Sequence, residues 1–251
     1  MKRLFLVTVL LLAGCGGGGD RVTGPPLPAI AKRCGAAHAD WQTLWLKASD
    51  GTRLDAAEAG SGSRGVLMLH ESPADLCGWE PYGAELVRQG FHVLLLDLRA
   101  YGLSQRGPYG GQRGAVADVR GAVNELKHRG AKQVAVVGAS YGGVTALAAA
   151  PELGPEISGV ASLSGELELN NAGLNALAAM PQIQVPVLVM GSRKDPYLDD
   201  TDARELLQAA TASRAQLVEF DGSDHGWNLL DPTHKQRAYA VLVGFLRSVT
   251  E

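Results

Sequence analysis

The chain has 251 residues, of which 46% are hydrophobic and 20% are charged. This length and hydrophobic content suit one domain with a sizeable core rather than two domains. With 23 basic and 26 acidic side chains, the formal net charge is -3, which gives no electrostatic reason to expect a nucleic-acid partner. We therefore expect the ligand to be a small molecule that is neutral or weakly charged.

The N-terminal segment has the pattern of an export signal. Lys2 and Arg3 precede an apolar run, Leu4 to Ala13, that is too short to span a bilayer. The run ends in LAGC at Cys15, which resembles the lipobox of bacterial lipoproteins. The resemblance implies that residues 1–14 are a signal peptide and that Cys15 carries a lipid anchor of the palmitate type. The alternative is an ordinary secretory peptide with an incidental cysteine.

Because Gly16 rather than Asp follows the cysteine, the same resemblance favours the outer membrane of the bacterial cell envelope. Residues 15–40 then link the anchor to the domain, since GGGGDRVTGPPLP from Gly16 to Pro28 is typical of a flexible spacer. We place the domain at residues 41–251. Cys34 and Cys77 would meet an oxidising compartment after export, and we expect them to pair as a disulfide. Two buried free thiols are the alternative.

From Trp41 onward, β-rich runs alternate with helical stretches, which predicts a mostly parallel sheet with helices on both faces. The first two strands form a hairpin, and the others are near-continuous apolar runs, as buried parallel strands are. The eight expected strands are 41–46, 52–58, 65–70, 91–98, 133–138, 159–163, 185–190 and 215–220. The expected helices are 79–88, 115–127, 141–150, 200–210 and 232–249. Only about twenty residues, 166–184, separate two of the strands, so a large lid does not fit.

The motif GASYG, Gly138 to Gly142, lies directly between an expected strand and an expected helix. It resembles the nucleophile elbow, a tight strand-to-helix turn in which small flanking residues allow a strained serine. The alternative is a glycine-rich turn with an idle serine. We predict that Ser140 is a nucleophile.

A serine hydroxyl needs a base, and the base needs a carboxylate that orients it. Asp195 follows the strand VPVLVM, and His225 follows the strand QLVEF. Because the carboxyl ends of parallel strands share one edge of a sheet, both are expected to meet Ser140 there. The alternatives are that Asp195 caps a turn before Pro196 and that His225 is a solvated loop residue.

The order Ser140, Asp195, His225 resembles that of serine hydrolases of the α/β-hydrolase superfamily, of the dienelactone-hydrolase and esterase type. The resemblance covers Trp41 to Val249 and implies an α/β-hydrolase fold with a minimal lid. It also implies an oxyanion hole formed by the amides of Tyr141 and Ser72.

Two segments near the expected site depart from the family pattern. In Leu69 to Pro73, Glu71 stands where the family commonly has glycine. The amide of Glu71 is an alternative to that of Ser72 as an oxyanion donor. The Glu71 carboxylate would repel an oxyanion unless it points away or is paired. We expect His70 to be a structural hydrogen-bonding residue. In Asp97 to Ser104, which resembles a family motif after the fourth strand, Ala100 replaces a usual glycine. Asp97 is expected to pair with Arg99, or Arg99 to bond loop carbonyls, and either contact would brace the same edge.

The resemblance implies that Ser140 attacks an ester-type carbonyl of a small substrate, in a carboxylic ester, a thioester or a lactone. We find no His or Cys cluster with ligand spacing and no phosphate-cradling loop, so we expect no metal and no organic cofactor. The sequence does not indicate an oligomeric state. The alternatives are a non-catalytic envelope lipoprotein that binds a ligand or partner, and a short-peptide serine peptidase.

Overall fold

The structure, a computed structural model, describes residues 22–211, 214–230 and 236–251. Eight strands form one sheet in the order β1-β2-β4-β3-β5-β6-β9-β10. The pairs β1·β2 and β2·β4 are antiparallel, and all other pairs of this sheet are parallel. The strands are β1 (Gln42–Lys47), β2 (Arg53–Ala59), β3 (Arg64–Leu69), β4 (His92–Leu96), β5 (Gln133–Ala139), β6 (Gly159–Leu163), β9 (Val187–Ser192) and β10 (Ala215–Phe220). The mostly parallel, eight-stranded sheet predicted from the sequence is confirmed.

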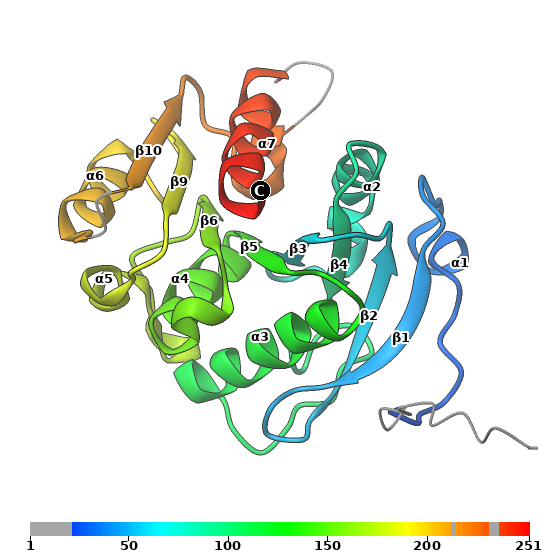
Figure 1. The fold of residues 1–251 in the computed structure, drawn as a ribbon. Helices are drawn as coiled ribbons and strands as arrows, with labels where there is room; N and C mark the ends of the chain where they lie inside the picture. Colours follow the sequence, from blue (N-terminus) through cyan, green and yellow to red (C-terminus); the bar gives the residue numbers. More distant parts are fainter. Residues whose placement is uncertain (1–21, 212–213, 231–235) are drawn as a thin grey trace, which may run out of the picture.

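Helices cover both faces of this sheet (Figure 1). Residues of α3, α4 and α6 pack into one hydrophobic cluster, and residues of α2 and α7 pack into the cluster on the opposite face. The α-helices of the described residues are α1 (Ile30–Cys34), α2 (Glu80–Arg88), α3 (Gly111–His128), α4 (Tyr141–Leu153), α5 (Ala176–Ala179), α6 (Asp200–Ala209) and α7 (Gln236–Thr250). Short 3-10 helices are η1 (Leu76–Trp79), η2 (Gly154–Glu156), η3 (Asn170–Ala172), η4 (Met180–Gln182) and η5 (Gly226–Leu230).

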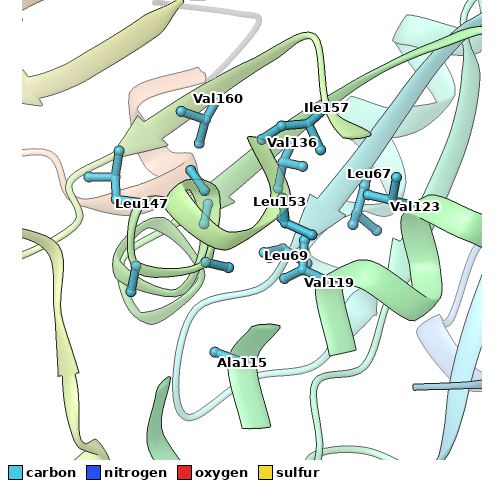
Figure 2. Packing of buried hydrophobic residues seen from close by; sticks show 14 of the residues in the cluster. Leu67, Leu69, Ala115, Val119, Val123, Val136, Leu147, Leu153, Ile157 and Val160 are labelled. Atoms are coloured by element: carbon cyan, nitrogen blue, oxygen red, sulfur yellow. The ribbon is translucent and has the colours of Figure 1, made fainter. Parts of the chain in front are cut away.

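Buried hydrophobic residues pack between the sheet and helices α3 and α4 (Figure 2). Leu69 of β3 and Val136 of β5 are fully buried, as are Val119 of α3 and Leu147 of α4. Burying one such aliphatic side chain contributes about 1.5–3 kcal/mol. Helix α4 is apolar on nearly all sides, as expected of a helix that neighbouring elements enclose, and most of its residues are buried. The helix that follows Ser140 is therefore firmly fixed to the sheet.

The segment between β6 and β9 is short, as expected. It contains the two-residue strands β7 (Glu168–Leu169) and β8 (Leu174–Asn175), with η3 between them and α5 and η4 after them. No large lid is inserted here. Among the described residues, no helix has the combined length and hydropathy that crossing a bilayer requires.

The packed part of the chain begins before residue 41, which corrects the expectation that residues 15–40 are only a spacer. Helix α1 lies within that range, and its Ile30 is 2% exposed among core residues. Arg33 forms ion pairs with Asp55 of β2 and with Asp97. Cys34 is joined to Cys77 by a disulfide. The helix packs because each of these three side chains has a partner in the domain.

Candidate active site

Ser140 lies in the sharp turn between β5 and α4. Its backbone has φ 48° and ψ -117°, a conformation that non-glycine residues rarely adopt and that commonly marks functional sites. The flanking glycines are required by close backbone contacts. A Cβ at Gly138 would lie 2.0 Å from the carbonyl oxygen of Gly142, and one at Gly142 would lie 2.2 Å from that of Leu69. The spacing GASYG therefore produces the elbow that the sequence predicts.

Asp195 and His225 meet beyond the carboxyl ends of β9 and β10. His225 Nδ1 lies 2.9 Å from both carboxylate oxygens of Asp195, which fixes Nδ1 as the donor and leaves Nε2 as the basic nitrogen. Asp195 also accepts a hydrogen bond from the Tyr197 amide at 3.0 Å. Burial raises the pKa of Asp195, but these hydrogen bonds outweigh burial and leave the pKa below its ordinary value. Asp195 is therefore the ionised partner of the His225 ring.

Further carboxylates surround the His225 ring. Burial lowers the pKa of His225, but the hydrogen bond with Asp195 and the charges of Asp195, Glu71 and Glu166 raise it above its ordinary value overall. Burial raises the pKa of Glu166, with a lowering contribution from His225 and a raising one from Asp195. The ring of Tyr197 packs against the imidazole, with the centroids 4.8 Å apart.

Glu71 points into the segment that carries His225. Gly226 has φ +59°, and a Cβ there would lie 1.8 Å from Glu71 Oε2 and 3.7 Å from the Cβ of Ala139. Burial raises the pKa of Glu71, although the charge of His225 and the Trp227 amide lower it. The absence of a side chain at residue 226 thus makes room for the carboxylate. It also places the residue after His225 against the residue before Ser140.

The Ser140 hydroxyl forms no hydrogen bond with His225 among the contacts of the described residues. The backbone neighbours of the two residues are nevertheless adjacent, as the contact between positions 226 and 139 shows. Hydrogen bonds between a nucleophile and its base are often long without substrate and shorten in the substrate complex. The structure thus brings Asp195 and His225 into direct contact and Ser140 to the same edge.

The loop after β3 adjoins the elbow, because Gly142 abuts the end of that strand. His70 is fully buried below this loop. Its Nδ1 donates to the carbonyl of Glu71 at 2.9 Å, and its Nε2 accepts from the Leu98 amide at 3.1 Å. Burial lowers the pKa of His70, so the ring stays neutral, as that acceptor role requires. His70 is thus a structural residue of the loop.

Within the same loop, Ser72 Oγ accepts a hydrogen bond from the hydroxyl of Tyr101 at 3.0 Å. The ring of Tyr101 packs against those of His70 and Tyr141, with centroids 4.9 and 5.4 Å apart. These contacts connect the loop of Ser72 to the first residue of α4. The two amides expected to form the oxyanion hole, those of Ser72 and Tyr141, lie on these two connected segments.

A family model described as the alpha/beta hydrolase fold matches residues 66–182. The protein has the alpha/beta hydrolase fold. The matched part includes the loop of Ser72 and the elbow of Ser140, whereas Asp195 and His225 lie beyond it. The fold predicted from the sequence is confirmed.

Solved structures with this alpha/beta hydrolase fold include esterases. An esterase from Pyrococcus furiosus has a TM-score of 0.75 at 19% sequence identity, over 92% of this chain and 98% of that chain. For an esterase from Exiguobacterium antarcticum the TM-score is 0.69 at 19% identity, over 82% of this chain and 100% of that chain. For a monoacylglycerol lipase from Paleococcus ferrophilus the TM-score is 0.67 at 18% identity, over 78% of this chain and 98% of that chain. No match was found among curated protein sequences. At such identities the likeness concerns the fold.

A cavity of about 380 Å³ lies beside the elbow, lined by Tyr141 and Thr145 of α4 and by Tyr101 and Arg106 from the loop after β4. Because Tyr141 directly follows Ser140, this cavity is the candidate substrate pocket. A larger cavity of about 550 Å³ is lined by residues of α2 and α7 and by none of the elbow. Neither cavity has Ser140, Asp195 or His225 among its lining residues, so the choice between them rests on the position of Tyr141. Among the described residues, no group of three or more His, Cys, Asp or Glu side chains is placed to hold a metal ion.

Arg99 braces the wall of this pocket, although not through the expected pairing with Asp97. It forms ion pairs with Asp118 at 2.7 Å and with Asp50 at 3.0 Å. It also donates to the carbonyl of Tyr109, which confirms the other possibility, that Arg99 bonds loop carbonyls. The pairing with Asp97 is replaced because Arg33 of α1 occupies that carboxylate.

Arg33, Glu166 and Tyr197 were not among the residues predicted from the sequence to belong to the site. Glu166 and Tyr197 follow strands β6 and β9 at their carboxyl ends, so the rule that located Asp195 and His225 applies to them as well. Arg33 gave no such signal, because it precedes the first strand. The predicted lipidation site, Cys15, lies outside the described residues.

Proposed function

We propose that the protein is a serine hydrolase that cleaves ester-type bonds of small substrates through an acyl-enzyme. The observation that carries the proposal is the contact of His225 Nδ1 with both oxygens of Asp195 at the sheet edge where Ser140 occupies a strained turn. A base held by a carboxylate beside a serine in an elbow is the arrangement that activates a hydroxyl. The similarity to solved esterases supports the same conclusion.

In the proposed reaction, Ser140 Oγ forms a bond to the carbonyl carbon while His225 Nε2 takes the hydroxyl proton. The carbonyl oxygen becomes an oxyanion, which the amides of Tyr141 and Ser72 stabilise. When this intermediate collapses, the bond to the leaving oxygen or sulfur breaks, and that atom takes the proton from Nε2. Water then repeats the sequence on the acyl-enzyme, releasing the acid and restoring Ser140.

The substrate is a small carboxylic ester, thioester or lactone. The cavity of about 380 Å³ beside Tyr141 is near the lower end of the size range of small-molecule sites. The short segment between β6 and β9 places no large lid over it. A substrate of modest size, or one end of a longer one, fits such a site.

The cellular location is also part of the proposal. The N-terminal pattern of residues 1–15 supports export and attachment of the protein to the outer membrane through lipidated Cys15. Mass spectrometry of the protein from a Gram-negative host tests this attachment. We expect an N-terminal peptide that begins with a lipid-modified Cys15, and an unmodified Cys15 would refute it.

The test of the chemistry is hydrolysis of p-nitrophenyl acetate by the full chain and by Ser140→Ala, His225→Ala and Asp195→Asn. Loss of the serine or the histidine lowers kcat about a million-fold in a well-studied serine hydrolase, and loss of the oriented tautomer about 10,000-fold. Matched surface variants Ser61→Ala, His128→Ala and Asp221→Asn are expected to keep the parent rate, because these side chains are exposed.

Full activity in Ser140→Ala would refute the mechanism. A fluorophosphonate probe, which reacts only with an activated serine, provides a second readout. We expect it to label the parent and not Ser140→Ala. A parent that is neither labelled nor active would instead favour the non-catalytic binding protein.

A further inference from the structure

Helix α1 carries an arginine that reaches the supports of the Ser72 loop. We propose that Arg33 is a positioning residue for the oxyanion hole: it bridges Asp55 and Asp97, and Asp97 in turn holds the backbone at the end of the Ser72 loop. The role as part of an oxyanion hole rests on the proposed function. The arrangement itself depends only on contacts in the structure.

Arg33 is inserted between two fully buried carboxylates. Its side chain is 10% exposed, and its guanidinium forms ion pairs with Asp55 and Asp97, whose side chains are both 0% exposed. Asp75, at the end of the Ser72 loop, lies 3.7 Å from the same guanidinium. Among the contacts of the described residues, Arg33 is the only cation paired with either buried carboxylate. Its planar fork matches a bridge between two carboxylates.

Asp97 transmits this bridge to the backbone on both sides of the site. Its Oδ1 accepts from the Leu76 amide at 2.8 Å, and its Oδ2 accepts from the Leu103 amide at 3.1 Å. Leu76 begins η1, directly after the loop of residues 71–75. Leu103 follows Tyr101, whose hydroxyl donates to Ser72 Oγ. One carboxylate therefore holds both the end of the loop that contains Ser72 and the segment whose Tyr101 contacts Ser72.

The ion pair of Arg33 and Asp97 occupies the space that a side chain at position 102 would need. Gly102 has φ +49°, and a Cβ there would lie 1.6 Å from Asp97 Oδ2 and 2.7 Å from an Arg33 nitrogen. A side chain at position 102 would therefore displace the ion pair. The glycine leaves room for the guanidinium to reach Asp97.

The Cys34–Cys77 disulfide fastens α1 to the same region. Cys34 is adjacent to Arg33, and Cys77 is adjacent to Leu76. The N-terminal helix thus grips the end of the Ser72 loop twice, through a covalent bond at residue 77 and through Asp97 at residue 76. Opening the disulfide removes the restraint that keeps Arg33 next to Asp55 and Asp97.

The two carboxylates depend on the cation. Burial and the neighbouring Asp97 raise the pKa of Asp55, and Arg33 lowers it; the overall result is a pKa raised to about 7. Without Arg33, two buried carboxylates face each other without a cation, and one of them must take up a proton or move. Either response changes the hydrogen bonds to Leu76 and Leu103.

The experiment compares the full-length parent with Arg33→Met, Arg33→Lys, Cys34→Ser/Cys77→Ser and the matched control Arg120→Met, which removes a half-buried, ion-paired arginine elsewhere in the fold. Arg120, in α3, pairs with Glu156 of η2, and none of its contacts among the described residues reaches the loop of residues 71–75. Two readouts are taken on protein shown by circular dichroism to be folded: kcat and KM for p-nitrophenyl acetate, and amide hydrogen exchange of residues 70–77 and 98–105.

We expect Arg33→Met to lower kcat at least tenfold with KM within twofold of the parent, because an oxyanion hole acts on the transition state. Exchange of residues 70–77 and 98–105 is expected to accelerate. Arg33→Lys, which keeps the charge but loses the fork, is expected to recover part of both effects. The double cysteine variant is expected to show the same changes to a smaller extent, and Arg120→Met neither.

An unchanged kcat in Arg33→Met, or faster exchange confined to residues 22–40, would overturn the proposal. If Arg33→Met does not fold, Arg33→Lys and the cysteine variant decide by the same two criteria. If the parent hydrolyses no ester, the proposed function fails, but the exchange readout still tests whether Arg33 holds the loop. Parent-like exchange in every variant would then refute the positioning role.

Discussion

Gly142 provides the sharpest test of the elbow geometry. In Gly142→Ala the new Cβ would lie 2.2 Å from the carbonyl oxygen of Leu69 and 2.7 Å from that of His70, whereas ordinary contact begins at 3.4 Å. Both neighbours are backbone atoms of β3 and its loop, so the elbow and the loop must separate by roughly 1 Å. Overpacking of this kind costs about 1–3 kcal/mol of stability, and a 1 Å misplacement lowers the rate about a hundredfold.

The assay measures kcat/KM for p-nitrophenyl acetate together with urea unfolding. Gly244→Ala is the matched control, because a Cβ at this position in α7 meets no atom within 4 Å. We expect the control to keep the parent activity and to gain about 1 kcal/mol of stability, since alanine is the better helix former. If Gly142→Ala kept more than half of the parent kcat/KM, close contact between elbow and loop would not be what positions Ser140.

Three further results are expected. Glu71→Gln removes a negative charge that raises the pKa of His225. Because the imidazole then stays neutral at lower pH, the acid limb of the kcat/KM profile is expected to move to lower pH. A move to higher pH would contradict this expectation. Leu147→Ala removes a fully buried side chain and is expected to cost about 2–5 kcal/mol in urea unfolding; a cost below 1 kcal/mol would contradict the packing described. Arg99→Met leaves Asp118 buried without its cation and is expected to lower the free energy of unfolding by about 3–5 kcal/mol in urea. An unchanged urea midpoint would contradict this expectation.

The elements that the sequence predicted well are those whose signal is local. Buried parallel strands such as β5 are continuous apolar runs, and the elbow requires glycine on both sides of Ser140. The positions of Asp195 and His225 followed from the rule that parallel strands share a carboxyl edge. These signals depend only on residues close together in the chain.

The elements that the sequence did not predict depend on distant partners. Arg33 lies 22 and 64 residues from Asp55 and Asp97, and in the sequence it stands in a segment rich in glycine, proline and alanine. Nothing near it indicates that its charge is buried. The direction of the Glu71 carboxylate was equally hidden, because it depends on the missing side chain of Gly226, which lies far along the chain.

Glu71 and Gly226 occupy what is in effect one shared volume, and this constrains how the sequence can diverge. A methyl group at 226 would displace the carboxylate, so position 71 must first become shorter before position 226 can become larger. The left-handed backbone at 226 further limits the replacements to residues such as asparagine. Relatives that have glycine at position 71 should therefore be the ones in which position 226 can carry a residue such as asparagine, and the two columns of an alignment should change in that order.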